Sequence, residues 1–229
     1  MLTRPRRAQL AQAVTGSNAE HIFYDQARPA RTHAAAHLLA SDCRRSPSRA
    51  APLQLFVKEP GCGTVTPWHT DHSYWQLAGG SVCTLWLALD VVPGSTVVGY
   101  AAGSHKWGLK HQIKSFSGDA GRYAASAAFP PPPDIDALEA KGEVQVLRWD
   151  VQPGDVLIFD SYVVHGSPGN ASNSVRRRAY ATHWANDGAR FDARPGTMHA
   201  RWAELGFDAR LAHGAPVACD LHPAIPTKL

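Results

Sequence analysis

Short apolar segments, separated by turns that contain Gly or Pro, make up most of the chain between residues 54 and 184. The run 82–89 is apolar at odd and even positions alike, which predicts a strand buried on both faces. Similar patterns predict strands over 20–26, 54–58, 96–101, 143–149, 156–160 and 175–184. Since no long helix-period run separates them, we predict a mostly β fold, a double-stranded β-helix (jelly roll, cupin-like) with a few flanking helices, including 3–14 and 198–205.

Two stretches interrupt this strand pattern. Residues 27–54 are rich in Ala, Arg and Ser and show no clear periodicity, so we expect a poorly ordered insertion whose helical part, if any, is 33–40. Residues 109–141 contain four consecutive prolines, a stiff spacer, and are expected to form a surface excursion of the kind that covers sites. The length of 229 residues suits one domain, 1–229, carrying the insertion at about 27–54.

The distribution of charged residues bears on which classes of binding partner we expect for this chain. Residues 1–50 hold eight Arg against three acidic residues, whereas 51–229 hold fifteen Lys and Arg against sixteen acidic residues. A neutral body argues against nucleic acid as a partner. No apolar run approaches the ~20 residues of a membrane span. We expect a cytoplasmic protein; the acid-free N-terminus and the final Thr-Lys-Leu are weak organellar and peroxisomal signals. The oligomeric state stays open.

Residues 66–75 hold the strongest candidate chemistry. If this segment is extended, His69 and Asp71 share one face and can offer a nitrogen and an oxygen to a single metal ion. That is two-thirds of the 2-His-1-carboxylate facial triad of non-haem Fe(II) oxygenases. Because a His-x-Asp triplet is expected about 0.7 times by chance in such a chain, the pair needs support from elsewhere.

That support comes from the end of the strand predicted at 156–160. His165 follows it, and Arg176 comes eleven residues later at the start of the next strand. In a jelly roll these strands are neighbours, so the Arg176 guanidinium could grip the distal carboxylate of a keto-acid co-substrate. A solvated edge is the alternative for Arg177 and Arg178. The other histidines near the motifs are expected to be structural, namely His72, His105 and His183.

Four segments resemble, in order and spacing, the phytanoyl-CoA dioxygenase family of Fe(II)/2-oxoglutarate oxygenases. They are LFVKEPG at 55–61, PWHTD at 67–71, GSH at 103–105, and HGS at 165–167 with the arginine at 176. The resemblance covers about 55–184 and implies Fe(II), 2-oxoglutarate as co-substrate and O2. It implies these site residues: His69, Asp71 and His165 as iron ligands, Arg176 and Ser167 on the 2-oxoglutarate C5 carboxylate, Trp86 lining the co-substrate pocket, and Trp75, beside Tyr74, on the substrate side.

The implied reaction is hydroxylation of a small organic molecule with release of succinate and CO2. A carboxylate at Asp71 argues against halogenation, because a small residue there would leave room for halide. Two departures from the family keep an alternative open, a catalytically inactive jelly roll that binds a metal or a ligand. One is the segment 93–99. The other is 27–54, which splits one strand and is either a genuine insertion or a gene-prediction artefact.

Overall fold

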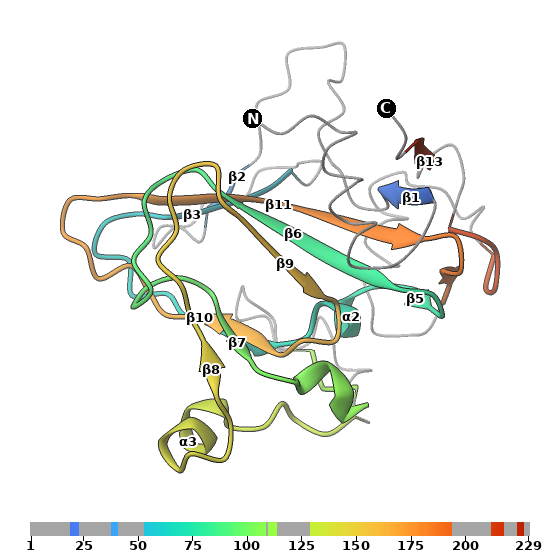
Figure 1. The fold of residues 1–229 in the computed structure, drawn as a ribbon, viewed down its shortest axis with the longest axis horizontal. Coiled ribbons are helices and arrows are strands. Elements are labelled where there is room, and N and C mark those ends of the chain that lie inside the picture. The colour runs from blue at the N-terminus through green and yellow to red at the C-terminus, as the bar shows by residue number, and fades with distance from the viewer. Residues whose placement is uncertain are drawn as a thin grey trace.

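The computed structural model describes residues 19–22, 38–40, 53–108, 110–113, 129–193, 212–217 and 224–226. The mostly β jelly roll is confirmed, since two sheets face each other with only short helices beside them (Figure 1). The larger sheet comprises β1 (Ala19–Ile22), β2 (Leu38–Ala40), β3 (Leu53–Lys58), β6 (Val82–Ala88), β9 (Val156–Asp160), β11 (Arg177–Asn186) and β13 (Ala224–Pro226). The second comprises β4 (Thr66–His69), β7 (Gly99–Ala101), β8 (Val146–Leu147) and β10 (His165–Ser167), and β5 (Leu77–Ala78) pairs with β12 (Arg190–Phe191).

Strand β11 organises the larger sheet. Along one side it pairs antiparallel with β6, which in turn pairs with β9. Every residue of β6 is buried, as the apolar run on both parities predicts. The strands predicted at 96–101 and 143–149 are real but shorter, because only Gly99–Ala101 and Val146–Leu147 join the second sheet.

The other side of β11 pairs with two strands in succession. Ile22 of β1 lies opposite Trp184, and Leu55 of β3 lies opposite Tyr180. β1 and β3, which are far apart in sequence, thus pair with the same side of β11. This is the arrangement expected if an insertion splits one strand. The helix considered for 33–40 is wrong at its end, because Leu38–Ala40 form β2, parallel to β3. Residues 27–37 and 41–52 lie outside the described residues.

Three short helical elements flank the sheets: α2 (Asp71–Tyr74), η1 (Ser104–Trp107) and α3 (Ile135–Ala140). The pattern along 109–141 did not predict α3, which follows the prolines and is capped by Asp134, whose Oδ1 accepts from the Ala137 N–H at 3.0 Å. Trp68 Nε1 donates to Asp136 Oδ1 at 3.1 Å, so this excursion is fastened to β4. Within the described part of the chain, no helix is long and apolar enough to cross a membrane. The helices predicted at 3–14 and 198–205 lie outside that part.

An apolar core fills the space between the sheets and borders the site. Its buried side chains come from both layers and include Trp86, Val97, Tyr100, Phe159, Ala179 and Ala181. The larger sheet contributes through β6, β9 and β11, and the second sheet contributes through β7. Side chains that could bind a metal between these sheets are therefore surrounded by a largely apolar interior.

Candidate metal centre and anion pocket

Three side chains meet at one end of the second sheet. His69 ends β4, His165 begins β10 directly opposite it, and Asp71 begins α2. The Nε2 atoms of His69 and His165 each lie 3.6 Å from Asp71 Oδ1, and the three ligand atoms lie within 4.8 Å of one another. Two imidazoles and one carboxylate gathered at this spacing fit a first-row divalent metal such as Fe(II).

The backbone around this cluster differs from the extended segment that we predicted. The chain is extended only as far as Thr70 (φ −112°, ψ 138°), and Asp71 lies in the first turn of α2. The N–H of His72 donates to the Ser161 carbonyl at 3.0 Å, which ties this turn to the end of β9. His69 and Asp71 therefore converge through a strand-to-helix junction and not through the two-residue period of a strand.

Main-chain carbonyls orient both histidines. The Nδ1 of His69 lies 2.7 Å from the Pro67 oxygen, and that of His165 lies 2.9 Å from the Val163 oxygen. Since a carbonyl oxygen can only accept, each Nδ1 carries a proton and each Nε2 lone pair is left for a metal. Burial, with the nearby His69, lowers the pKa of His165 to about 4, so its imidazole is neutral near pH 7, as ligation requires.

A hydrogen-bond chain positions the carboxylate of Asp71. Thr84 Oγ1, on β6, donates to Asp71 Oδ2 at 2.6 Å and lies 2.9 Å from His183 Nδ1, on β11. Because the threonine proton goes to the carboxylate, the His183 N–H donates to the threonine oxygen. Burial would raise the pKa of Asp71, but His165 and His69 hold it well below its ordinary range. Asp71 is thus ionised, with Oδ1 left to face the histidines.

The remaining histidines near the motifs, which we expected to be structural, lie outside the three-residue metal cluster. His183 is buried and is not part of the three-ligand cluster, although it is linked to Asp71 through Thr84. His72 is buried as well, with Nε2 2.8 Å from the Tyr162 hydroxyl and the two rings stacked. His105 lies exposed in η1.

A second cluster, the anion pocket, consists of Lys58, Ser167 and Arg177. Ser167 Oγ accepts from Lys58 Nζ at 3.0 Å and from Arg177 at 3.2 Å, and Arg177 also donates to the Thr96 carbonyl. All three side chains of the pocket are buried. Among the described residues neither cation has a carboxylate within salt-bridge distance. Two buried cations without a counter-ion are costly, so this pocket is suited to an anion.

The electrostatics of the anion pocket reflect this crowding of positive charge. Burial lowers the pKa of Arg177 to about 10, which leaves the guanidinium charged. Burial, together with the charge of Arg177, lowers the pKa of Lys58 to about 7. A bound carboxylate would reverse both effects, since an opposite charge favours the protonated forms.

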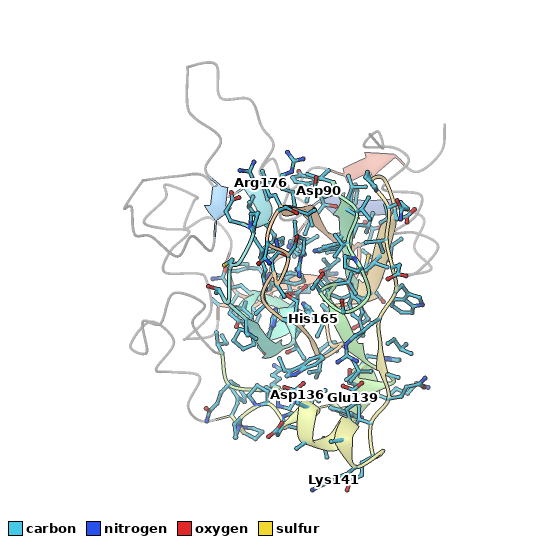
Figure 2. All side chains as sticks on the ribbon, turned by 90° about the vertical axis from the view of Figure 1, so that its left-hand side faces the viewer. Asp90, Asp136, Glu139, Lys141, His165 and Arg176 are labelled. Carbon is cyan, nitrogen blue, oxygen red and sulfur yellow. The ribbon has the colours of Figure 1, made fainter. Side chains whose placement is uncertain are left out.

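The structure does not place Arg176 in this pocket. Its side chain is half exposed at the edge of the molecule, whereas His165 lies in the interior (Figure 2), and its Nε donates to Glu59 Oε2 at 2.8 Å. Arg177 is the arginine that points inward, and Arg178 points out again to pair with Asp90 at 2.7 Å. We therefore predicted the right residue type, but the buried arginine is the next residue in the chain.

The other expected site residues are all buried. Ser167 lies between the two cations, and Trp86 belongs to the apolar core beside the site. The ring of Tyr74 meets that of His69 edge-on with centroids 5.6 Å apart, and Trp75 meets His183 at 4.3 Å. Tyr74 therefore borders the metal cluster, whereas Trp75 supports the Thr84–His183 side of it. Neither forms an exposed rim.

The sequence patterns did not single out Lys58, Thr84 or Tyr100, and they did not predict that Arg177 points inward. The first lies in a segment that carried the family resemblance, LFVKEPG, and a buried lysine at the end of an apolar strand was the available signal. The others occupy strand positions where nothing in the local pattern separates a pocket residue from a core residue.

Comparison with known proteins agrees with this architecture. A curated "Probable phytanoyl-CoA dioxygenase" of Caenorhabditis elegans is 27% identical over 146 residues, which is 60% of this chain and 43% of that protein. The chain thus spans less than half of that relative. The solved structure of the epimerase SnoN from nogalamycin biosynthesis, in complex with Fe3+, alpha ketoglutarate and nogalamycin RO, matches with a TM-score of 0.61 at 20% identity, over 96% of this chain and 70% of that one.

A second solved structure, the non-heme alpha ketoglutarate dependent carbocyclase SnoK, matches with a TM-score of 0.53 at 22% identity, over 75% of this chain and 59% of that one. At such identities these two likenesses concern the fold. The sequence profile named Phytanoyl-CoA dioxygenase (PhyH) matches residues 4–179, which is most of the chain. This chain therefore belongs to the phytanoyl-CoA dioxygenase (PhyH) family.

Proposed function

We propose that the chain is an Fe(II)/2-oxoglutarate-dependent dioxygenase that hydroxylates a small organic molecule. The observation that carries the proposal is the placement of two complementary sites on β10. His165 belongs to the metal cluster, and Ser167, two residues further along the strand, belongs to the anion pocket. Two residues of strand span roughly 6–7 Å, a length suited to a short dicarboxylic keto acid. Such a molecule can meet the metal at one end and Arg177 at the other.

The chain's residues divide this work between them. His69, Asp71 and His165 hold the iron, and the Thr84–His183 pair keeps the carboxylate ligand in place. Arg177 takes the role that we had expected of Arg176. With Lys58 and Ser167, it neutralises and orients the distal carboxylate.

Bound iron and 2-oxoglutarate supply the oxidising chemistry, which consumes O2 and yields succinate, CO2 and hydroxylated product. The apolar side chains around the site, including Trp86 and Phe159, exclude water from it. Tyr74, next to His69, is the proposed substrate-side residue, whereas Trp75 packs against His183. Hydroxylation is the outcome we propose, because the carboxylate of Asp71 occupies the position that a halide would need.

The divergence of segment 93–99, one of the two arguments for a catalytically inactive jelly roll, does not favour that alternative. The divergent segment 93–99 is well packed, since Val97 is fully buried and the Thr96 carbonyl accepts from Arg177. The segment therefore contacts the anion pocket through its main chain, despite its departure from the family pattern. No observation in the described residues favours the inactive reading over the enzymatic one.

An anaerobic titration tests the proposal. Fe(II) and 2-oxoglutarate added to the protein should give a weak visible charge-transfer band, which His69→Ala should abolish. Arg176→Gln, a charge change at the surface, serves as the matched control and should keep the band. Absence of the band in folded wild-type protein would reject the enzyme. If the band forms, succinate release with candidate small molecules then identifies the substrate class.

A further inference from the structure

Tyr100 of β7 faces the interior beside the metal cluster. Its Cα is paired with that of His165 across the β7–β10 ladder, so both side chains project from the same face of the second sheet. The two rings are nearly parallel, with centroids 6.0 Å apart and an interplanar angle of 23°. Phe159 packs on the tyrosine ring at 4.9 Å. The ring is thereby fixed between the two sheets.

The hydroxyl of Tyr100 has no hydrogen-bond partner within the part of the chain that the structure describes, although the side chain is only 6% exposed. It sits in an apolar core, where an unpaired hydroxyl costs free energy and phenylalanine would pack equally well. Burial and the charge of Asp71 raise the pKa of Tyr100, so the phenol keeps its proton and is available as a donor. A group in this state needs an acceptor, and the described residues do not provide one.

The charges that act on Tyr100 locate its hydroxyl. Both Asp71 of the metal cluster and Arg177 of the anion pocket interact with it electrostatically. With its ring 6.0 Å from that of His165, it is close to the metal cluster and within the electrostatic influence of the anion pocket. Ser167 Oγ already receives hydrogen bonds from both Lys58 and Arg177, so among the described residues it is not a free acceptor for the phenol. A bound 2-oxoglutarate would bring carboxylate oxygens that can accept this hydrogen bond.

We propose that the Tyr100 hydroxyl donates a hydrogen bond to a carboxylate oxygen of bound 2-oxoglutarate and is a binding residue for the co-substrate. This inference rests on the proposed function and adds a third kind of contact to those of Arg177 and Lys58. A phenol donates one directional bond without adding positive charge. It therefore tightens co-substrate binding without worsening the repulsion between the two cations.

Tyr100→Phe removes the hydroxyl and keeps the ring. In the anaerobic Fe(II) titration we expect the Kd for 2-oxoglutarate to rise roughly tenfold, because a hydrogen bond to a charged group is lost. Fe(II) affinity without 2-oxoglutarate should stay unchanged. Tyr180→Phe is the matched control, since this buried tyrosine alternates with Ala179 and Ala181 and so points to the other face of β11. Its Kd should equal that of wild type.

Thermal unfolding provides a second readout. Without ligand, Tyr100→Phe should unfold at the wild-type temperature or above it, because an unpaired buried group has been removed. The stabilisation that 2-oxoglutarate adds should become smaller. An unchanged Kd overturns the inference, whether or not the unliganded variant loses stability. If wild-type protein gives no charge-transfer band, the proposed function fails and this inference fails with it. If wild type gives the band, and wild type and Tyr100→Phe have equal Kd values for 2-oxoglutarate, only the role of Tyr100 is rejected.

Discussion

Arg176 and Arg177 are consecutive in the chain, yet one pairs with Glu59 at the surface and the other donates to Ser167 in the interior. Arg176 directly precedes β11 and Arg177 begins it. Because neighbouring side chains of an extended chain point to opposite faces, the first faces solvent and the second faces the anion pocket. The contrast also gives a matched pair of variants, in which the same chemical change is made on the two sides of one sheet.

Arg177→Gln should weaken 2-oxoglutarate binding by about 10- to 100-fold, because charge-assisted hydrogen bonds to the distal carboxylate are lost. Arg176→Gln should change the Kd less than twofold, because an exposed ion pair contributes little. The anaerobic charge-transfer titration measures both. Equal effects of the two substitutions, or a larger effect at Arg176, would contradict the assignment to Arg177.

The three members of the candidate metal cluster could be predicted from the sequence because their residue types and order are distinctive. His69, Asp71 and His165 come together as expected, even though Asp71 lies on a helical turn. The sequence did not indicate which arginine points inward, because a spacing of eleven residues crosses a loop and a shift of one residue exchanges the two faces of a strand. Both parities of β11 are buried from Ala179 onward, so hydrophobic alternation offered no means of choosing the face.

The pocket residues that were missed share a different physical cause. Lys58 reaches Ser167 of the opposite sheet, Thr84 reaches Asp71, and Tyr100 packs on Phe159 of the opposite sheet. In each case the partner lies far away in the sequence. A local pattern can report that a strand is buried, but it does not report which strand faces it. Sheet pairing had to be known before these contacts could be inferred.

Thr84→Val should weaken Fe(II) binding about 10- to 100-fold, because the hydroxyl that holds Asp71 Oδ2 is removed at nearly constant volume. Thr84→Ser keeps the hydroxyl and should bind iron nearly as well as wild type. Competition with a chromophoric chelator under anaerobic conditions measures the affinities. Wild-type affinity in a stably folded valine variant would show that the hydroxyl does not position the ligand.

The affinity for 2-oxoglutarate should depend on pH through Lys58. Its pKa is lowered to about 7, so the lysine is charged below this value and loses its charge as the pH rises through it. The Kd should therefore increase between about pH 6.5 and 8.5, and binding at the upper end should take up a proton, because the anion favours the charged lysine.

Lys58→Met should bind 2-oxoglutarate more weakly than wild type at pH 6.5 and show a nearly flat profile across that range. Arg177, whose pKa stays near 10, does not titrate there. Lys106→Met, a change at an exposed lysine, should leave the wild-type profile intact. A slope that survives in Lys58→Met would assign the titration to another group.

Asn170→Ala should lower the free energy of unfolding by about 1–3 kcal/mol, because two carbonyls lose their donor in a buried setting. The Asn170 amide donates to the Lys58 carbonyl at 3.0 Å and to the Val175 carbonyl at 2.8 Å, and so ties together the loop between Ser167 and Arg177. Urea unfolding measures the loss. Ser174→Ala, in the exposed part of the same loop, should stay within about 0.5 kcal/mol of wild type.

Both metal-facing histidines take their orientation from the carbonyl two residues earlier, Pro67 for His69 and Val163 for His165. A carbonyl of the main chain is present whatever side chain that residue carries. The hydrogen bond that orients each imidazole therefore does not depend on the side chain at the accepting position. The hydrogen bond that orients Asp71 does, because it comes from the side chain of Thr84. Sequence drift at positions 67 and 163 should be tolerated by the metal site as long as the two strands keep their path, whereas position 84 should accept only residues that bear a hydroxyl.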